Sequence, residues 1–437
     1  MKKLIAALLG ALLVAPVPGW TAPNDPYFSH QWGLTEIGAD DAWRRSTGRG
    51  VIVAVIDTGV DPSHPDLKGR LLAGKDFVDD DEDPRDENGH GTLIAGIVAA
   101  STGNGVGVAS VAPKAKVLPV RVLDADGTGV SSDVADGIDW AVARGVDVIN
   151  LSLAQEGAGG RGGVLGDELL GDPSVGDAIK EAARAGVTVV VAAGNDRGGG
   201  RSETAFDAEV GGVVVVGAST KTDQLAAYSN YGAGLDIVAP GGGSASNPRE
   251  NGCTQLNSIV STWWDPEDRE STYGGGCGTS MAVGFVSGVA ALLHARGMSN
   301  VQVVQKMLST AKDLGAPGRD DRFGHGRLDA ARALGVTSKP KPKQSASTAP
   351  RPKPSEERGT VVVQGDPDPI STPSETPTAS APARPRRAPE PLPPVAFPAG
   401  LPEQTKGWPV SAAAGLVSVL VLAHVLVFLR RAEQRTG

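Results

Sequence analysis

Residues 51–57 read VIVAVID, an apolar run rich in β-branched side chains that stops at an aspartate. Such a run is typical of a strand that is buried on both faces of a parallel sheet. Residues 187–191 (VTVVV) form a second run of this kind. The sequence therefore predicts an α/β fold. It also places Asp57 at the carboxyl end of a strand, where open α/β sheets hold their functional sites.

A histidine and a serine each stand in a glycine-containing turn ahead of an apolar segment. His90 lies in NGHGT, followed by the helix-compatible residues 93–100, and Ser280 lies in GTSMA, followed by the apolar residues 283–293. The glycines beside His90 allow close backbone approach. A serine in the first turn of a helix gains from the partial positive charge there. Both side chains are therefore candidates for a reactive site.

The chain order Asp57, His90, Ser280 is one of the orders that build Ser-His-Asp hydrolase triads. In that chemistry Ser280 attacks a peptide carbonyl, His90 takes the serine proton, and Asp57 holds the imidazole tautomer. A fourth side chain, Asn195, ends the segment AAGN after the strand at 187–191. Alone, an aspartate after a strand or an asparagine in a loop is usually a turn residue. Four such pieces in this order leave little room for that explanation.

These motifs resemble those of the subtilisin family of serine proteases, the subtilases, and the likeness extends over about residues 24–336. Within the family the local sequence is most similar to the calcium-dependent thermitase type. The resemblance implies a three-layer α/β fold with a mostly parallel, seven-stranded sheet flanked by helices, and a peptidase domain over residues 23–336. It also implies that Asn195 is the amide donor of the oxyanion hole.

The resemblance further implies that an extended peptide lies between two segments that pair with its backbone by β-augmentation. The expected substrate contacts are Gly127, Thr128, Gly129, Ser152, Leu153, Ala154 and Gly194. Ala154 replaces a glycine that is usual in the family, and its methyl group predicts a slightly narrower entrance to the first specificity pocket. Residues 155–171 resemble a glycine-rich, acidic insertion, for which a solvated loop is the favoured interpretation.

Calcium follows from the same resemblance, because carboxylate, amide and carbonyl oxygens are the ligands that this ion prefers. The first expected site combines the side chains of Asp25, Asp66 and Asn104 with the carbonyls of Thr102, Val106 and Val108. The second lies in the acidic run at residues 76–83 and uses Asp76, Asp79 and Asp81. Arg85 stands where such a loop has a neutral ligand, so a solvated acidic loop is the alternative for this second site.

Composition and cysteine content fit an exported enzyme. The chain has 437 residues, a net charge of -9 and a pI near 5.3, which argues against binding to nucleic acid. In an exported protein its only two cysteines, Cys253 and Cys277, predict one disulfide, which would close a loop ending three residues before Ser280. A pair of free thiols is the open alternative. Two thiols without a nearby histidine make a poor zinc site.

Both ends of the chain predict targeting to a membrane. Residues 1–22 combine two lysines with an apolar core at 4–14 and predict a secretory signal peptide. Residues 337–407 are rich in proline, serine, threonine and basic residues and predict a disordered linker. Residues 408–429 are long and apolar enough for a transmembrane helix, and arginines in the tail at 430–437 predict a cytoplasmic end. The expected protein spans the membrane once, with an extracytoplasmic catalytic domain.

This layout, with no folded propeptide expected after the signal peptide, resembles that of the mycosins, the membrane-anchored subtilisins of type VII secretion. Two functions follow. The first is a tethered endopeptidase that cuts a protein or peptide substrate. The second is a structural component of a secretion complex, with a secretion-system partner and a dispensable catalytic site. The presence of all four active-site side chains favours the first, because a scaffold has no physical need of them.

Overall fold

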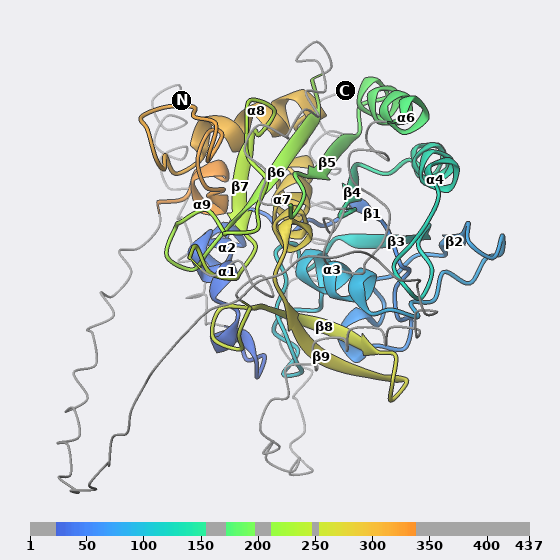
Figure 1. The fold of residues 1–437 in the computed structure, drawn as a ribbon. Coiled ribbons are helices and arrows are strands. Elements are labelled where there is room, and N and C mark those ends of the chain that lie inside the picture. The colour runs from blue at the N-terminus through green and yellow to red at the C-terminus, as the bar shows by residue number, and fades with distance from the viewer. Residues whose placement is uncertain (1–22, 154–171, 197–210, 247–252, 338–437) are drawn as a thin grey trace, which may run out of the picture. The chain divides into compact units, whose positions relative to one another are not determined.

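The computed structural model describes the chain from residue 23 to residue 337 with three internal gaps (Figure 1). The described residues are 23–153, 172–196, 211–246 and 253–337. The predicted signal peptide, the linker beyond residue 337, the transmembrane helix and the tail lie outside them, as do Ala154 and the predicted insertion. Within the described part of the chain, no helix is both long and apolar enough to cross a membrane.

A sheet of seven parallel strands forms the centre of the domain (Figure 1). Neighbouring strands follow the order β2-β3-β1-β4-β5-β6-β7. Their bounds are β1 (Ile52–Asp57), β2 (Lys75–Asp76), β3 (Lys116–Arg121), β4 (Val148–Leu151), β5 (Thr188–Ala192), β6 (Val213–Ser219) and β7 (Ile237–Pro240). The predicted mostly parallel, seven-stranded sheet is confirmed, and the run at 51–57 provides its strand β1.

Helices cover both faces of this sheet. The longer ones are α3 (His90–Ala99), α4 (Ser131–Ala143), α6 (Pro173–Arg184), α7 (Thr279–His294) and α8 (Asn300–Thr310). The shorter ones are α1 (Trp32–Glu36), α2 (Ala39–Ala42), α9 (Ala330–Ala333) and the 3-10 turns η1 (Phe28–His30) and η2 (Pro65–Leu67). Helices α3 and α7 pack on one face of the sheet, and α4 and α6 pack on the other (Figure 1).

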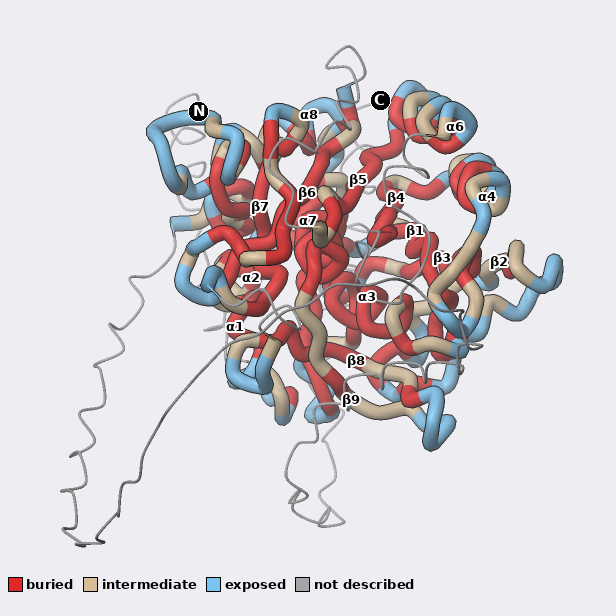
Figure 2. Tube along the Cα trace, viewed as in Figure 1, coloured by how far each residue is buried: buried red, intermediate tan, exposed pale blue. Residues whose placement is uncertain are grey.

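Strand β1 shows why both faces are covered. Val53 and Val55 belong to a core shared with α3 and α7, whereas Ala54 and Ile56 belong to a second core shared with α4 and α6. All four side chains are fully buried. Because strand residues alternate between faces, an apolar residue at every position requires a layer of helices on each side. The inner strands of the sheet and α7 accordingly form the buried interior (Figure 2).

The strand order brings the ends of β1, β4 and β5 together at one edge. From β1 the chain passes to β2 and β3 on one side and then to β4 through β7 on the other. Open α/β sheets bind ligands outside the carboxyl edge, at the point where the strand order reverses in this way. Asp57 ends β1, Ser152 follows β4, and Asn195 follows β5. The order of the strands therefore places these predicted site residues at the same edge of the sheet.

A separate antiparallel hairpin, β8 (Ile259–Asp265) and β9 (Glu270–Gly276), packs against α3. Ser261 and Thr262 each donate a side-chain hydrogen bond to a carbonyl in the first turns of α3. The disulfide between Cys253 and Cys277 joins the two ends of the segment that contains this hairpin, which confirms the predicted pairing. The hairpin thus connects the helix that begins with His90 to the helix that carries Ser280.

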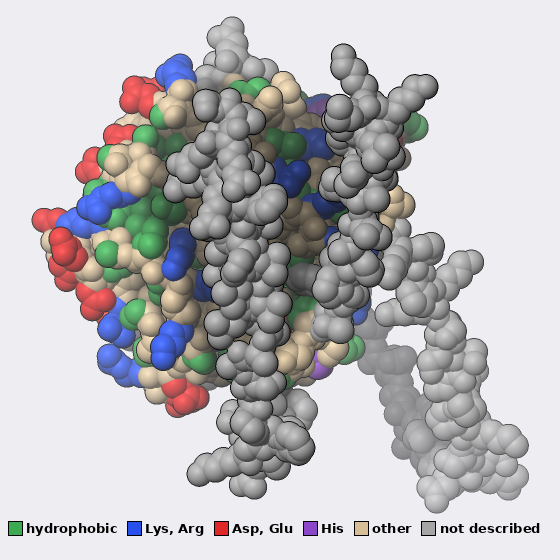
Figure 3. Space-filling view, turned by 180° about the vertical axis from the view of Figure 1, so that it is seen from behind, with side chains coloured by type: hydrophobic (Ala, Val, Ile, Leu, Met, Phe, Trp, Pro, Cys, Tyr) green, Lys and Arg blue, Asp and Glu red, His purple; other side chains and the backbone are tan. Residues whose placement is uncertain are grey.

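The surface carries charges of both signs. On the face seen in Figure 3, Lys and Arg side chains lie near Asp and Glu side chains along one edge. Arg44 pairs with Asp41, and Lys312 pairs with Asp223, among the ion pairs of the described residues. Such mixed exposed pairs contribute little to stability, about 0–1 kcal/mol each.

Candidate active site

Asp57 and His90 form a close pair at the carboxyl edge of the sheet. The distance from His90 Nδ1 to Asp57 Oδ1 is 2.7 Å. The Asp57 side chain is fully buried, whereas that of His90 is 27% exposed. An ionised carboxylate can only accept hydrogen bonds, so Nδ1 carries the proton of this bond. In the neutral ring this leaves Nε2 as the acceptor nitrogen, which is the form that a general base needs.

The surroundings of His90 favour its charged form. Burial by itself lowers the pKa of the imidazole, but the charge of Asp57 and its hydrogen bond act in the opposite direction, and the charge of Asp86 adds to them. The net result is a pKa above the ordinary histidine value. A base with a raised pKa holds a transferred proton more firmly during the reaction.

Ser280 is the second residue of α7, whose N-terminus meets the same edge. Its hydroxyl donates to Ser152 O at 2.9 Å, and Ser152 Oγ donates to Ser280 O at 3.1 Å. These two bonds fix the start of α7 against the end of β4. Among the described contacts, no hydrogen bond joins Ser280 to His90. Catalytic hydrogen bonds are often long or unformed before substrate binds.

The Asn195 amide is oriented by Thr279, a residue that the sequence reasoning did not single out. Asn195 Oδ1 accepts from the backbone N–H of Thr279 at 3.0 Å and from its hydroxyl at 3.1 Å. With its oxygen held in this way, the amide has its Nδ2 group left to donate. A Cβ added at Gly278 would lie 3.7 Å from Nδ2, so the amide adjoins the segment that carries Ser280.

The turn around Asn195 is held from behind by Asn230. The Asn230 backbone N–H donates to Gly194 O at 2.9 Å. Its side chain accepts from Asp196 N at 3.0 Å and donates to Ala193 O at 3.0 Å. Gly194 has φ +100, and a Cβ there would lie only 2.5 Å from Asn230 Nδ2. This close packing and the positive φ explain the glycine directly before Asn195.

The two predicted substrate segments follow β3 and β4, the two strands that flank β1 with its terminal Asp57. Thr128 closes a turn with Asp124 through three hydrogen bonds of 2.7 to 2.9 Å, and so orders the segment from Gly127 to Gly129. Asn88, two residues before His90, donates from Nδ2 to Ala125 O at 2.9 Å and connects this loop to the histidine. Ser152 and Leu153 directly follow β4, beside Ser280.

A model of the Subtilase family matches residues 48–326 of the chain. The chain belongs to the subtilase family. It is similar to the Thermophilic serine proteinase of Bacillus sp. (strain AK1), with 39% identity over 317 residues, or 72% of this chain and 69% of that protein. It is also similar to thermitase from Thermoactinomyces vulgaris, with 38% identity over 313 residues, or 71% of this chain and 99% of thermitase.

Comparison with solved structures agrees with this assignment. A protease of Pseudoalteromonas arctica PAMC 21717 superposes with a TM-score of 0.60 and 34% identity, covering 72% of this subtilase and 99% of that chain. The subtilisin-like fold predicted from the sequence is therefore confirmed, and the protein is a subtilisin-like serine endopeptidase.

The first predicted calcium cluster of this subtilase contains two buried carboxylates that face one loop. Asp25 accepts from the backbone N–H groups of Gly103 and Asn104, at 2.8 to 3.1 Å. Asp66 accepts from Asn104 Nδ2 at 2.8 Å and from Val108 N at 2.9 Å. Neither carboxylate forms an ion pair with any described residue. Burial raises the pKa of both, and the charge of Asp25 raises that of Asp66 further.

These residues fit a calcium ion in their chemistry. Two partly desolvated carboxylates that repel each other gain from a cation between them. The predicted carbonyl donors, of Thr102, Val106 and Val108, belong to the same loop. Among the described residues, however, no group of three or more acidic, histidine or cysteine side chains surrounds one point. Backbone and amide oxygens would therefore complete the ligand set.

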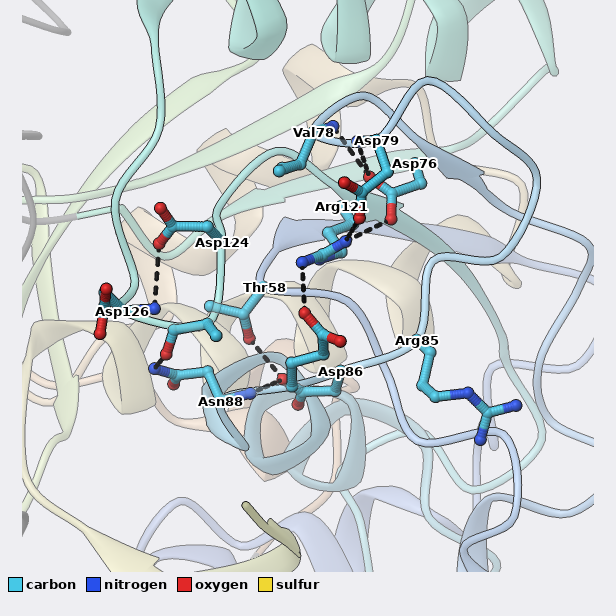
Figure 4. A network of polar contacts seen from close by, with 12 residues as sticks. Thr58, Asp76, Val78, Asp79, Arg85, Asp86, Asn88, Arg121, Asp124 and Asp126 are labelled. Carbon is cyan, nitrogen blue, oxygen red and sulfur yellow. Dashed lines mark hydrogen bonds and ion pairs between the residues drawn. The ribbon is translucent and has the colours of Figure 1, made fainter. Parts of the chain in front are cut away.

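The second predicted calcium cluster does not fit, because a guanidinium lies within it (Figure 4). Arg121 Nη1 lies 2.6 Å from Asp76 Oδ2 and 2.6 Å from Asp79 Oδ2, and Nη2 lies 2.7 Å from Glu87 Oε2. Burial alone would lower the pKa of Arg121, but its hydrogen bonds to the two aspartates raise it above the ordinary value. The positive charge that the acidic run needs is supplied by the chain itself.

Asp81, the third predicted ligand of that cluster, and the nearby Arg85 do not contact Arg121. Asp81 Oδ1 accepts from Asp83 N at 2.8 Å, and Arg85 Nε lies 3.7 Å from an exposed oxygen of Asp83. Figure 4 shows Arg85 apart from the network around Arg121. The expectation of a calcium site at Asp76, Asp79 and Asp81 is therefore wrong on chemical grounds. The residue that decides this is on β3, distant in sequence from the acidic run.

Asn195→Ala and Thr279→Val are expected to affect the same step. Loss of the Asn195 amide should lower kcat by about 10²–10³, the range known for the oxyanion-hole asparagine of subtilisin. Thr279→Val removes one neutral hydrogen bond to Asn195, which contributes about 0.5–1.5 kcal/mol, or a fall in kcat of roughly 2- to 10-fold with KM unchanged. Steady-state kinetics on a peptide p-nitroanilide measures both. In the Asn195→Ala enzyme, Thr279→Val should have no further effect, and additive losses would contradict this account.

Proposed function

We propose that this subtilase cleaves peptide bonds through an acyl-enzyme on Ser280, with His90 as general base, Asp57 as its partner and Asn195 as oxyanion donor. The observation that carries the assignment is the 2.7 Å bond between His90 and Asp57 at the sheet edge where α7 presents Ser280. In the first step the Ser280 oxygen bonds to the substrate carbonyl carbon as its proton passes to His90 Nε2. The peptide C–N bond then breaks, and His90 returns the proton to the leaving amine.

The buried charge of Asp57 supports this proton transfer. Its Oδ1 accepts from His90 and from Thr58 N at 2.8 Å, while its buried Oδ2 has no hydrogen-bond partner among the described residues. A carboxylate that is only partly neutralised by hydrogen bonds stabilises a positive charge next to it. That charge is the imidazolium formed when His90 accepts the Ser280 proton. The same bond fixes the tautomer with Nε2 free.

The hydroxyl of Ser280 must leave its present acceptor for the reaction to begin. It now donates to Ser152 O. In a substrate complex, the carbonyl edge that follows β4 is the expected partner of the peptide backbone. Binding of substrate along Ser152 and Leu153 would therefore compete for this acceptor and favour the serine conformer that faces His90.

Covalent labelling tests the proposed nucleophile. A fluorophosphonate probe is expected to label the full-length protein, and Ser280→Ala is expected to abolish the label because the attacking oxygen is gone. Ser287→Ala is the matched control, since it removes a buried hydroxyl from the same helix, seven residues further on, and retains the nucleophile. Absence of label in a folded wild-type protein would disprove the assignment and would favour the second predicted function, a structural role in a secretion complex.

We also propose that the enzyme acts from the outer side of a membrane to which its C-terminal segment is anchored. The support is the sequence: an apolar stretch at 408–429 followed by arginines, and a leader-like segment at 1–22. About 70 residues, the predicted linker, separate the catalytic domain from this stretch in the sequence. Extracytoplasmic polypeptides near the membrane are the substrate class that such a tether favours.

Cell fractionation tests the anchor. The full-length protein is expected in the membrane fraction after a high-salt and carbonate wash, and a chain ending at residue 406 is expected in the soluble extracytoplasmic fraction. The physical reason is the loss of about twenty apolar residues, the length needed to span the hydrocarbon core. A chain ending at residue 431 is the control and should stay in the membrane. Retention of the shorter chain in the washed membranes would refute anchoring by this segment.

We further propose that the cluster of Asp25 and Asp66 binds a structural calcium ion. Calcium at 100 times its Kd is expected to raise the free energy of unfolding by about 2.7 kcal/mol. Asp66→Asn should remove most of this increase, because it deletes one of two buried negative charges at the site. Asp81→Asn, in the acidic run at residues 76–83, should leave it unchanged. Thermal unfolding with calcium and with a chelator measures both, and an equal calcium response in wild type and Asp66→Asn would rule the site out.

A further inference from the structure

Asp86 is a fully buried carboxylate four residues before His90 that the proposed reaction does not use. Its Oδ1 accepts from Thr58 Oγ1 at 2.8 Å and from the backbone N–H groups of Asn88 and Gly89 at 3.0 and 2.8 Å. Its Oδ2 accepts from Thr92 N at 2.8 Å and Thr92 Oγ1 at 2.5 Å. Figure 4 shows Asp86 between Thr58 and Asn88.

These contacts connect the start of α3 to the end of β1. The Thr58 hydroxyl donates to Asp86 and accepts from Gly91 N at 2.9 Å. The Thr92 hydroxyl donates to Asp86 and accepts from Asp61 N at 2.9 Å. Each threonine thus relays between the carboxylate and a backbone N–H on the far side. Thr58, which is next to Asp57, and the residues around His90 therefore donate to the same carboxylate, that of Asp86.

The network favours an ionised Asp86. Three of its five partners are backbone N–H groups, which can only donate, and the two threonine hydroxyls each already accept a bond from another backbone N–H. Burial raises the pKa of Asp86 above its ordinary value, and its hydrogen bonds with Gly89, Thr92 and Asn88 oppose this rise only in part. The carboxylate also lies at the N-terminus of α3, where the helix dipole favours a negative charge.

We propose that Asp86 is a positioning residue for the proposed reaction: it holds the imidazole of His90 against Asp57, and its charge stabilises the imidazolium. This inference rests on the proposed roles of His90 and Asp57. No direct contact between Asp86 and His90 is needed, because the carboxylate acts through Thr58 and the first turn of α3. A structural carboxylate elsewhere in the core would not have this effect on the histidine.

The charged groups near His90 lie at the end of β1 and just before α3. Asp57 on β1 and Asp86 ahead of α3 are the charged groups that act on its pKa. The hairpin meets the adjacent Gly89 with Trp263 and Trp264, which carry no charge. Glu87 directs its carboxylate to Arg121 at 2.7 Å and is 55% exposed. The effect of removing the Asp86 charge can therefore be distinguished from the effect of removing the Glu87 charge, one residue later.

Asp86→Asn is the decisive variant, with Glu87→Gln as its matched control. Only the neutral imidazole accepts the Ser280 proton, so kcat/KM of the wild type rises with pH through the raised pKa of His90. Removal of the Asp86 charge destabilises the imidazolium, and this limb should move to lower pH. We expect kcat to fall at least about tenfold, as one charged hydrogen-bond acceptor is lost, with KM little changed. Glu87→Gln should leave both the limb and kcat unchanged.

A second readout does not depend on activity. NMR titration of His90 in the full-length Ser280→Ala protein should show a lower imidazole pKa with Asp86→Asn and an unchanged one with Glu87→Gln. An unchanged His90 pKa and kcat in folded Asp86→Asn would overturn the proposal. If the wild type fails to react with a fluorophosphonate while the His90 pKa still falls in Asp86→Asn, the proposed function is wrong, and only the effect of the Asp86 charge on the imidazole is retained.

A milder variant covers the case in which Asp86→Asn does not fold. Thr58→Val keeps the shape of the side chain and removes the hydroxyl relay between Asp86 and Gly91. The rate of fluorophosphonate labelling is expected to fall at least roughly 10-fold, because the variant loses a hydrogen bond to the Asp86 carboxylate and the acceptor of Gly91 N. Labelling at the wild-type rate, with an unchanged His90 pKa, would overturn the proposal through this variant as well.

Discussion

The burial of β1 between two cores is the constraint on which the rest of the structure depends. Because Val53 and Val55 pack on one side and Ala54 and Ile56 on the other, the strand has no freedom to shift or rotate. Its end is therefore a fixed point in the middle of the sheet. α3, which begins with His90, and α7, which carries Ser280, both pack on the same face of that sheet. The positions of Asp57, His90 and Ser280 are thus determined by a strand and two helices rather than by loops.

The site also contains two buried negative charges, those of Asp57 and Asp86. Asp57 and Asp86 are both fully buried, and within the described residues neither contacts a lysine or an arginine. Backbone N–H groups and threonine hydroxyls satisfy Asp86 instead, which keeps its charge directed toward the start of α3. Such fixed dipoles require no rearrangement when a proton moves, and this is the property that electrostatic catalysis requires.

The fold and the four site motifs could be predicted from the sequence because each has a local signal. The run at 51–57 indicates a buried strand by composition alone, and the turns of His90 and Ser280 combine glycine with a following apolar helix. The roles of Thr279, Asn230 and Asp86 could not be predicted, because each depends on which distant backbone groups the fold brings near. The calcium site predicted in the acidic run was wrong for the same reason. Arg121 lies opposite Asp57 on the neighbouring strand β3, and the hydrophobic pattern of that strand does not reveal that its side chain contacts the acidic run.

The guanidinium of Arg121 has a consequence for the environments in which the protein can work. A metal ion is shared with the surrounding medium, so its occupancy follows the free concentration there and falls when another ligand competes for it. A covalently attached cation has no such equilibrium and is present whenever the chain is folded. Near β2 the domain therefore carries a permanent counterion, and this part of the structure does not depend on the concentration of divalent ions in the surrounding medium.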